Sequence, residues 1–342
     1  MDGKTLESSF EVDMAGNNSP GLFQAIRFRC AEVTRRATSV SIDDVGLHRF
    51  AERLASDPSA GVNLDPARDV EGDGYELLAF LVALDAINFG SGWFPLLRKK
   101  DRMSGYRTIA AACRKRFESE GAWSGEALRA TTPESMAELL GQDFDSRSKD
   151  QGVSELMGLY ARAWRDLGDW LAEEHVDRFD HFVEAADYSA ERMVLDLAKM
   201  PFYQDVAGYA ELEVPFYKRA QITVADLNLA FGSGRFGRFH DLDQLTLFAD
   251  NLVPHVLRCE GVLVYARDLE AKIESEALLV VGTRVEVEIR AVALEAVERL
   301  VDALERLGSS TTAYELDGRL WNAGQAPEIK ARPRHRARST YY

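Results

Sequence analysis

Three aspartates lie within ten residues of one another in the segment FHDLDQLTLFADNLVPHVL, residues 239–257. Either Asp241 or Asp243 can cap a helix that begins near Leu242, and for Asp243 we favour the cap. Asp250 lies deeper in an apolar stretch, where a carboxylate is costly unless it is paired or faces a cleft. A catalytic acid or base explains Asp250 as well as a cap of the next helix does. The residues themselves therefore leave both interpretations of Asp250 open.

Basic residues that could bind an anion occur in two places. Lys218 and Arg219 lie in the segment VPFYKRAQITVADL. A helix that begins near Phe216 would place both in its first turn, where the helix dipole also favours an anion. A solvated charged face explains the pair equally well. The second place is the C-terminal segment RPRHRARSTYY, residues 332–342, whose aromatic end predicts that it docks back onto the domain.

Motifs for metals, cofactors and phosphate loops are weak or missing. The six histidines are scattered and form no pair with the spacing of metal ligands on a helix. The glycine-rich segment FGSGRFGRF, residues 231–239, follows a helical pattern rather than a strand. A surface turn therefore explains this segment better than a phosphate loop. We expect no metal and no cofactor.

Helical periodicity dominates the chain that must position these residues. Apolar residues recur at steps of three and four over most of residues 131–198, and the apolar run of residues 75–89 is too long for a strand. Thr283 and Glu286 have the spacing of a capping box at the start of another helix. Strand patterns are short and occur at residues 212–214, 278–281 and 313–316. The sequence thus predicts a mostly α protein, a single compact helical domain with a few short strands.

Composition narrows the class of protein. The 342 residues carry 41 Lys and Arg against 56 Asp and Glu, a net charge of −15. Tight sequence-independent binding to a nucleic acid polymer or to an anionic membrane needs a broad basic face, so we expect neither partner. Three cysteines without a CxxC pair argue against a disulfide framework or a structural zinc site. We expect a cytoplasmic protein, and nothing in the sequence indicates an obligate protein partner.

Seven sequence blocks, all in order, resemble the queuosine salvage protein family. The aspartate segment at residues 239–257 resembles the most typical motif of that family. The other blocks are INFGSGWF at 87–94, SGYRTIAAA at 104–112, VPFYKRAQITVADL at 214–227, VEVEIRA at 285–291, LDGRLWNAG at 316–324 and RPRHRARSTYY at 332–342. Seven ordered blocks are far more specific than one motif. We assign the family-like domain to residues 39–342 and treat residues 1–38 as a variable N-terminal segment, in part disordered.

The resemblance implies both an activity and a fold. The activity is hydrolysis of the N-glycosidic bond of queuosine 5′-phosphate, with the nucleoside queuosine as a further candidate substrate. The products would be queuine, which is a 7-deazaguanine base, and ribose 5-phosphate. The implied fold is helical and related to the helix-hairpin-helix DNA glycosylases, in agreement with the helical pattern. The acidic charge fits a free nucleotide better than a polymer.

The same resemblance implies roles for particular residues. Asp250 matches the catalytic aspartate, and Asp317 matches the position that accepts hydrogen bonds from the guanine-like edge of the base. Without the resemblance, Asp317 would be interpreted as opening a turn with Gly318. Further residues expected to bind the substrate are Asp241, Leu247, Phe248, Trp321, Lys218, Asn88 and Trp93. The aromatic rings among them would stack on the flat base, although core packing is their commoner fate.

Two other functions compete with this one. A DNA or RNA base glycosylase of the same fold class would need a basic stripe, which this acidic sequence lacks. A non-catalytic carrier of the deazapurine would need Asp317 and the aromatic rings but not Asp250. Turnover by the purified protein would distinguish an enzyme from a non-catalytic carrier. Binding to nucleic acid at physiological salt would distinguish a base glycosylase from a hydrolase of the free nucleotide.

Overall fold

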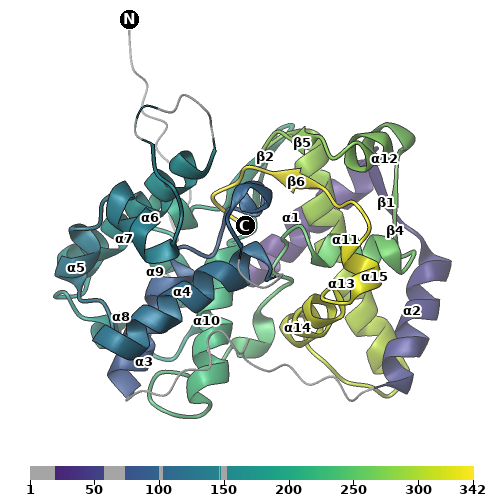
Figure 1. Cartoon of the computed structure of the whole chain (residues 1–342). Helices are drawn as coiled ribbons and strands as arrows, with labels where there is room; N and C mark the ends of the chain where they lie inside the picture. Colours follow the sequence, from purple (N-terminus) through teal and green to yellow (C-terminus); the bar gives the residue numbers. More distant parts are fainter. Residues whose placement is uncertain (1–19, 58–73, 100–102, 146, 148–151) are drawn as a thin grey trace, which may run out of the picture.

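The computed structural model describes residues 20–57, 74–99, 103–145, 147 and 152–342, and helices dominate them (Figure 1). One group of helices packs around α7, which buries one apolar face. The group comprises α3 (Gly74–Asp85), α4 (Gly105–Glu120), α5 (Gly125–Arg129), α6 (Pro133–Leu140), α7 (Val153–Glu174), α8 (Phe179–Ala185), α9 (Ala190–Leu197) and α10 (Lys218–Phe231). Helices α6 to α9 confirm the prediction for residues 131–198, and α3 confirms most of the prediction for residues 75–89.

A second group packs around the long helix α13, on the other side of the view in Figure 1. It comprises α1 (Leu22–Arg36), α2 (Asp44–Ser56), α11 (Val253–Cys259), α13 (Arg284–Arg306) and α14 (Ala313–Ala323), with α12 (Arg267–Glu274) and α15 (Pro327–Lys330) beside them. A continuous cluster of buried hydrophobic side chains runs through both groups. The C-terminal segment passes between the two groups in Figure 1.

Helix α1 is part of this core. Its apolar side chains Phe23, Ile26, Cys30 and Val33 are buried, and the helix packs on α13. Residues 22–36 therefore join the same core as the rest of the described chain, although they lie in the N-terminal segment predicted to be variable. The disorder predicted at the start of the chain concerns residues outside the described ranges.

The strands are short and form three separate pairs. Antiparallel pairs join β1 (Val40–Ile42) to β4 (Leu263–Tyr265) and β2 (Val206–Tyr209) to β3 (Leu212–Pro215), and a parallel pair joins β5 (Leu278–Leu279) to β6 (Arg336–Ala337). Strands β3 and β5 confirm two of the three predictions. The strand predicted at 313–316 is wrong, because Thr312 and Glu315 form a capping box and these residues begin α14. Short 3₁₀ turns complete the fold: η1 (Phe94–Leu96), η2 (Pro201–Tyr203) and η3 (Leu242–Gln244).

The start of α13 differs from its predicted form. Thr283 is the N-cap, but its side chain makes no capping bond and donates to the carbonyl of Val280 at 2.7 Å. Glu286 instead accepts from the backbone N–H of Gly282 at 3.0 Å. The predicted capping box is therefore wrong, although the helix begins where it was expected.

The described residues confirm a mostly α protein with a few short strands. The relation to helix-hairpin-helix glycosylases stays a prediction. Among the helices of the described ranges, none has both the length and the apolar character needed to cross a membrane.

Candidate active site

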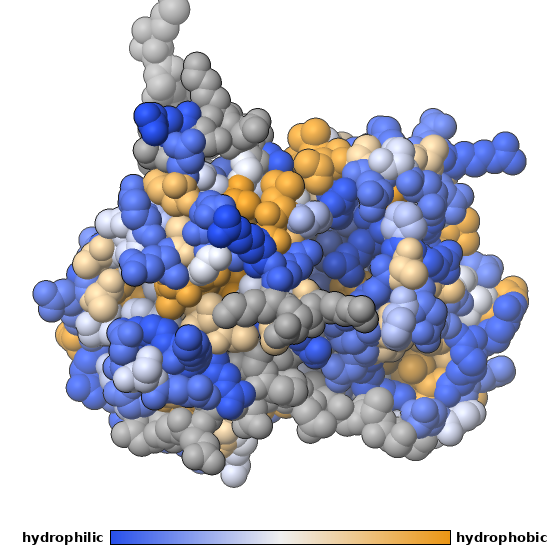
Figure 2. All heavy atoms as spheres, in the orientation of Figure 1, coloured by the Kyte–Doolittle hydropathy of each residue, from blue (hydrophilic) through white to orange (hydrophobic). Residues whose placement is uncertain are grey.

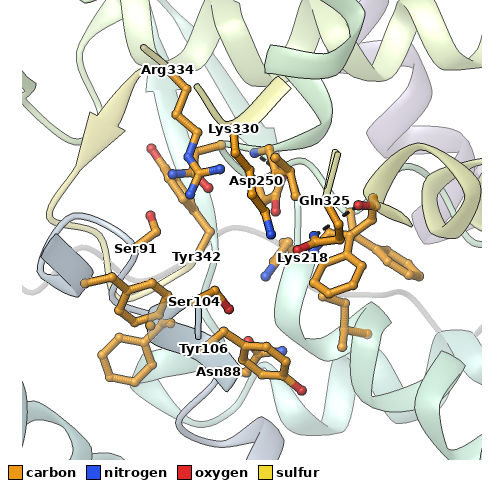
Figure 3. Close-up of a pocket in the computed structure, with 18 of the residues that line it drawn as sticks. Asn88, Ser91, Ser104, Tyr106, Lys218, Asp250, Gln325, Lys330, Arg334 and Tyr342 are labelled. Carbon is orange, nitrogen blue, oxygen red and sulfur yellow. Dashed lines mark hydrogen bonds between the residues drawn. The ribbon is translucent and has the colours of Figure 1, made fainter. Parts of the chain in front are cut away.

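A pocket of about 550 Å³ opens between the two groups of helices (Figure 3). Such a volume suits a small-molecule ligand. Its walls come from the loop after α3, the starts of α4 and α10, the segment before α11, helix α14 and the C-terminal segment. Six of the nine predicted site residues line it: Asn88, Lys218, Phe248, Asp250, Asp317 and Trp321. Residues far apart in the sequence thus meet in one cavity.

Asp250 both caps a helix and lines the pocket. The backbone N–H groups of Leu252 and Val253 donate to its Oδ1 at 2.7 and 2.9 Å, just ahead of α11. Its Oδ2 has no hydrogen-bond partner among the described residues. The two interpretations of Asp250 are therefore compatible, because one oxygen fixes the side chain and the other remains for a ligand.

Asp317 lies inside α14, not at a turn, so the interpretation as a turn residue is wrong. Its side chain is buried, and its Oδ1 accepts from the backbone N–H of Phe248 at 3.1 Å. Burial, and then the nearby charge of Asp250, raise the pKa of Asp317 well above its ordinary value. The Phe248 N–H and the Lys218 charge oppose this rise in pKa. Asp317 thus ties the segment at Phe248 to α14, and both residues line the pocket.

Aromatic side chains form part of the wall. Phe248 and Trp321 both line the pocket. The ring of Tyr106, another lining residue, meets that of Trp321 edge-on, with centroids 6.5 Å apart and an interplanar angle of 89°. Edge-to-face contact holds Trp321 in a defined orientation. Tyr106 lies within the SGYRTIAAA block but is not among the predicted site residues.

Two of the predicted substrate-binding residues lie outside the pocket lining. The indole N–H of Trp93 donates to Glu155 Oε2 at 2.8 Å, and the ring is 2% exposed. Leu247 is 1% exposed and packs in the core, one residue before the lining residue Phe248. Both side chains therefore pack in the core, as large apolar side chains usually do.

Asp241 also lies elsewhere. Its carboxylate accepts from Ser189 Oγ and from the backbone N–H groups of Ala190 and Glu191, at 2.9, 2.6 and 3.1 Å. It therefore stabilises the start of α9 from across the fold rather than lining the pocket. The cap predicted for Asp243 is also wrong, because its side chain is exposed and η3 has no side-chain cap.

Lys218 and Arg219 have different surroundings. Lys218 begins α10, is 6% exposed and lines the pocket. Arg219 does not line it. Its guanidinium donates to backbone carbonyls of the η2, α3 and C-terminal segments, which are those of Phe202, Asp85, Ala86 and Thr340. Arg219 thus fastens the loop after α3. Its burial outside the pocket lining fits neither of the two interpretations left open, an anion-binding residue or a solvated charge.

A buried ion pair that no sequence pattern predicts supports the segment around Asp250. Arg290 donates to both carboxylate oxygens of Asp205, at 2.9 and 2.6 Å, and both side chains are almost fully buried. The Nε of Arg290 also donates to the carbonyl of Ala249 at 3.0 Å. Asp205 in turn accepts from the backbone N–H of Lys218 at 3.1 Å. One ion pair therefore positions two lining residues, Lys218 and Asp250. The VEVEIRA block contained Arg290, but no local pattern pointed to its partner.

The C-terminal segment docks onto the domain, as its aromatic end predicts. Tyr342 is 3% exposed, and its hydroxyl donates to Glu286 Oε1 at 2.8 Å. Its main-chain oxygen accepts from the backbone N–H of Gly90 at 3.0 Å. The segment therefore holds the loop after α3 in place and completes one wall of the pocket.

Comparison with known proteins gives concordant matches. A family model described as "Queuosine salvage protein" matches residues 69–342. A protein of Sphaerobacter thermophilus named queuosine 5′-phosphate N-glycosylase/hydrolase is 34% identical over 316 residues, which cover 91% of this chain and 95% of the relative. Proteins of the same name from Bos taurus and Dictyostelium discoideum are 29% and 32% identical, covering 91% and 64% of this chain and 96% and 66% of their own length.

Proposed function

The chain belongs to the queuosine salvage protein family, and on this premise we propose that it hydrolyses the N-glycosidic bond of queuosine 5′-phosphate. The products are queuine and ribose 5-phosphate. One observation carries the proposal at the level of the site. Asp250, with an oxygen left for a ligand, shares one pocket with the buried acceptor Asp317 and two aromatic walls. The substrate is a free nucleotide, and the three free cysteines support action in a reducing cytoplasm.

Incubation of the purified protein with queuosine 5′-phosphate tests the proposal. Mass spectrometry should detect free queuine and ribose 5-phosphate in equal amounts. A carrier that binds the nucleotide without cleaving it would leave the nucleotide intact. That result would refute the proposed hydrolase activity.

Asp250 acts on the sugar. Cleavage of an N-glycosidic bond develops positive charge at the anomeric carbon, as in other glycoside cleavages. A carboxylate beside that carbon stabilises the charge or activates the attacking water. Because two backbone N–H groups hold Oδ1, the free oxygen Oδ2 keeps one position throughout the reaction. Such preorganisation is what makes an electrostatic catalyst effective.

Asp317 acts on the base. A 7-deazaguanine has no N7 to protonate, so the protein must bind and polarise it through its remaining polar edge. A carboxylate that accepts from the ring N1–H and the exocyclic amino group matches that edge. Phe248 and Trp321 supply the flat surfaces on which the base stacks, a contact of roughly 1–3 kcal/mol per base.

Asp317→Asn should weaken binding of the substrate by about 10–100-fold. The amide oxygen takes over the bond from the Phe248 N–H, so the amide nitrogen faces the base and meets its donors. Two opposed donors in a buried site cost about 1–3 kcal/mol, which sets the expected range. Calorimetric titration with queuine measures the effect. An unchanged dissociation constant would show that Asp317 does not bind the base.

Asp317→Asn weakens substrate binding, but it should preserve or raise the stability of the folded protein at neutral pH. A carboxyl whose pKa is raised in the folded state binds its proton more tightly there, so the folded state loses stability as the pH rises through the window above the ordinary pKa. Asp317→Asn removes that loss. At neutral pH the variant should unfold at the same urea concentration as the wild type or at a higher one. Stability of the wild type and of the variant is compared at pH 5 and at neutral pH. If both proteins lose the same amount of stability between these two pH values, Asp317 is not the group that causes the loss.

Activity should not depend on a metal ion. The histidines are scattered in the sequence, and the described residues include no group of three His, Cys, Asp or Glu side chains arranged to bind a metal. We expect the rate of queuine release to be the same before and after dialysis against EDTA. A loss that zinc or magnesium restores would show that the prediction is wrong.

A further inference from the structure

The C-terminal segment carries a buried histidine where it passes the pocket. Its neighbours in the chain, Arg334 and Arg336, line the cavity, and Figure 3 shows Arg334 there. Hydrophilic residues surround the hollow between the two groups of helices in Figure 2. His335 itself is withdrawn from solvent, since it is 1% exposed. Neither of its ring nitrogens has a hydrogen-bond partner among the described residues, which is unusual for a buried polar group.

The charges that act on His335 are positive. They come from the segment itself and from two helices packed against it: Arg334 precedes it, His255 and Arg258 lie on α11, and Arg290 lies on α13. Burial, and then these neighbours, lower the pKa of His335 to about 3. A proton added to this ring in the folded protein would therefore meet positive charge and no acceptor.

The carboxylates around these arginines are bound elsewhere. Arg290 donates to both oxygens of Asp205 at 2.9 and 2.6 Å. Arg258 donates to two glutamates of α12 at 3.3 and 2.7 Å. Glu286 on α13 accepts from the hydroxyl of Tyr342 at 2.8 Å. The surroundings of His335 thus accept the neutral ring and exclude the charged one.

A second buried histidine lies near the first. His255 is 2% exposed, its Nε2 lies 3.0 Å from the carbonyl oxygen of Ile329, and its Nδ1 has no partner in the described part of the chain. Burial, opposed by that carbonyl and reinforced by nearby arginines, lowers the pKa of His255 as well. The two imidazoles act on each other, so a proton on one makes a proton on the other still less favourable.

Detachment of the C-terminal segment would expose His335 to water. There the ordinary pKa of histidine, about 6.5, applies. Below that pH the detached form binds a proton that the docked form excludes, so acid shifts the equilibrium towards detachment. Between pH 7 and pH 5, one histidine of this kind shifts the equilibrium by about 20–30-fold.

We propose that His335, together with His255, makes docking of the C-terminal segment sensitive to acid, so that the segment is held at neutral pH and released at acidic pH. The segment forms one wall of the pocket and binds the loop after α3 at Gly90. Its release therefore opens the site and slows the reaction reversibly. The release is independent of the proposed function, whereas its effect on the formation of queuine rests on that function.

Hydrogen exchange at pH 7 and pH 5 tests the release. The N–H of Gly90 reports on docking, because its acceptor is the main-chain oxygen of Tyr342. After correction for the intrinsic pH dependence of exchange, its protection in the wild type should fall by at least about 20-fold between the two pH values. Protection of the backbone N–H groups of α7, which lies in the other group of helices, should fall less.

Two variants remove the proton-binding ring. His335→Leu keeps the site apolar and His335→Gln keeps it polar, so either one decides if the other fails to fold. In both, the fall in Gly90 protection should be smaller than in the wild type by about 20-fold. His48→Gln, which removes an exposed histidine from α2, should behave as the wild type does. The same fall in the His335 variants as in the wild type, or an equal fall throughout α7, would overturn the proposal.

Rates of queuine release at the same two pH values test the effect on the pocket. Relative to pH 7, the rate at pH 5 should fall further in the wild type than in His335→Leu, and a return to pH 7 should restore it. Equal relative rates in the two proteins would show that the segment does not control the reaction. If Gly90 loses protection as expected but the wild type forms no queuine at pH 7, the proposed function fails and the acid-sensitive docking stands.

Discussion

Asp250→Asn is expected to reduce the turnover of queuosine 5′-phosphate by about 100–1,000-fold, the usual effect of removing one electrostatic partner of a transition state. The substitution keeps the size of the side chain. The amide oxygen still accepts from the Leu252 and Val253 N–H groups, so the start of α11 stays intact. The negative charge at Oδ2 is lost. Because that charge acts on the transition state, kcat should fall while the affinity for queuine stays the same.

Asp243→Asn is the matched control in the same segment. Its side chain is exposed and contacts Gln244, away from the pocket lining. We expect it to turn over substrate at the wild-type rate. If Asp243→Asn were inactive and Asp250→Asn active, the roles of the two carboxylates would have to be exchanged. A calorimetric titration and a rate assay on each variant separate binding from turnover.

Arg290→Met is expected to lower the free energy of unfolding by about 3–5 kcal/mol, the usual cost of leaving a buried charge without its partner. The substitution strips Asp205 of two hydrogen bonds in a site closed to water. It also frees the Ala249 carbonyl, one residue before Asp250. The loss in stability should therefore be accompanied by a loss of activity in the fraction that remains folded. Urea denaturation followed by circular dichroism measures the first effect.

Arg299→Met on the same helix controls for the loss of an arginine from α13. Arg299 is 44% exposed and pairs with Glu295 one turn away. An exposed pair of this kind contributes about 0–1 kcal/mol. The two variants should thus differ by several kcal/mol, and similar urea midpoints would show that the Arg290–Asp205 pair does not support the pocket.

The sequence predicted those parts of the fold that depend on local patterns. Periodic apolar residues located α6 to α9, and the aromatic end of the chain predicted that the C-terminal segment docks. One prediction failed because a second local pattern, a capping box, was overlooked. The apparent strand at 313–316 is a helix start, because Thr312 and Glu315 outweigh the apolar residues beside them.

Distant contacts limit the prediction of the site. Asp250, Asp317, Phe248 and Trp321 share the pocket, and these came from blocks that resemble the family. Asp241 lies in the same block as Asp250, yet it caps α9, more than forty residues earlier in the chain. Arg290 and Asp205 could not be paired from the sequence, because neither has a local pattern that names a partner 85 positions away. Such partners depend on the tertiary fold alone.

During translation, helix α1 leaves the ribosome long before its partner α13 exists. About 250 residues separate the two helices in the chain. At roughly 5–20 residues per second, synthesis of that interval lasts roughly 10–50 s. Throughout this time Phe23, Ile26 and Val33 lack α13, the element against which α1 packs most extensively in the finished protein. We expect the nascent chain to expose this apolar stripe and to bind chaperones there until α13 emerges.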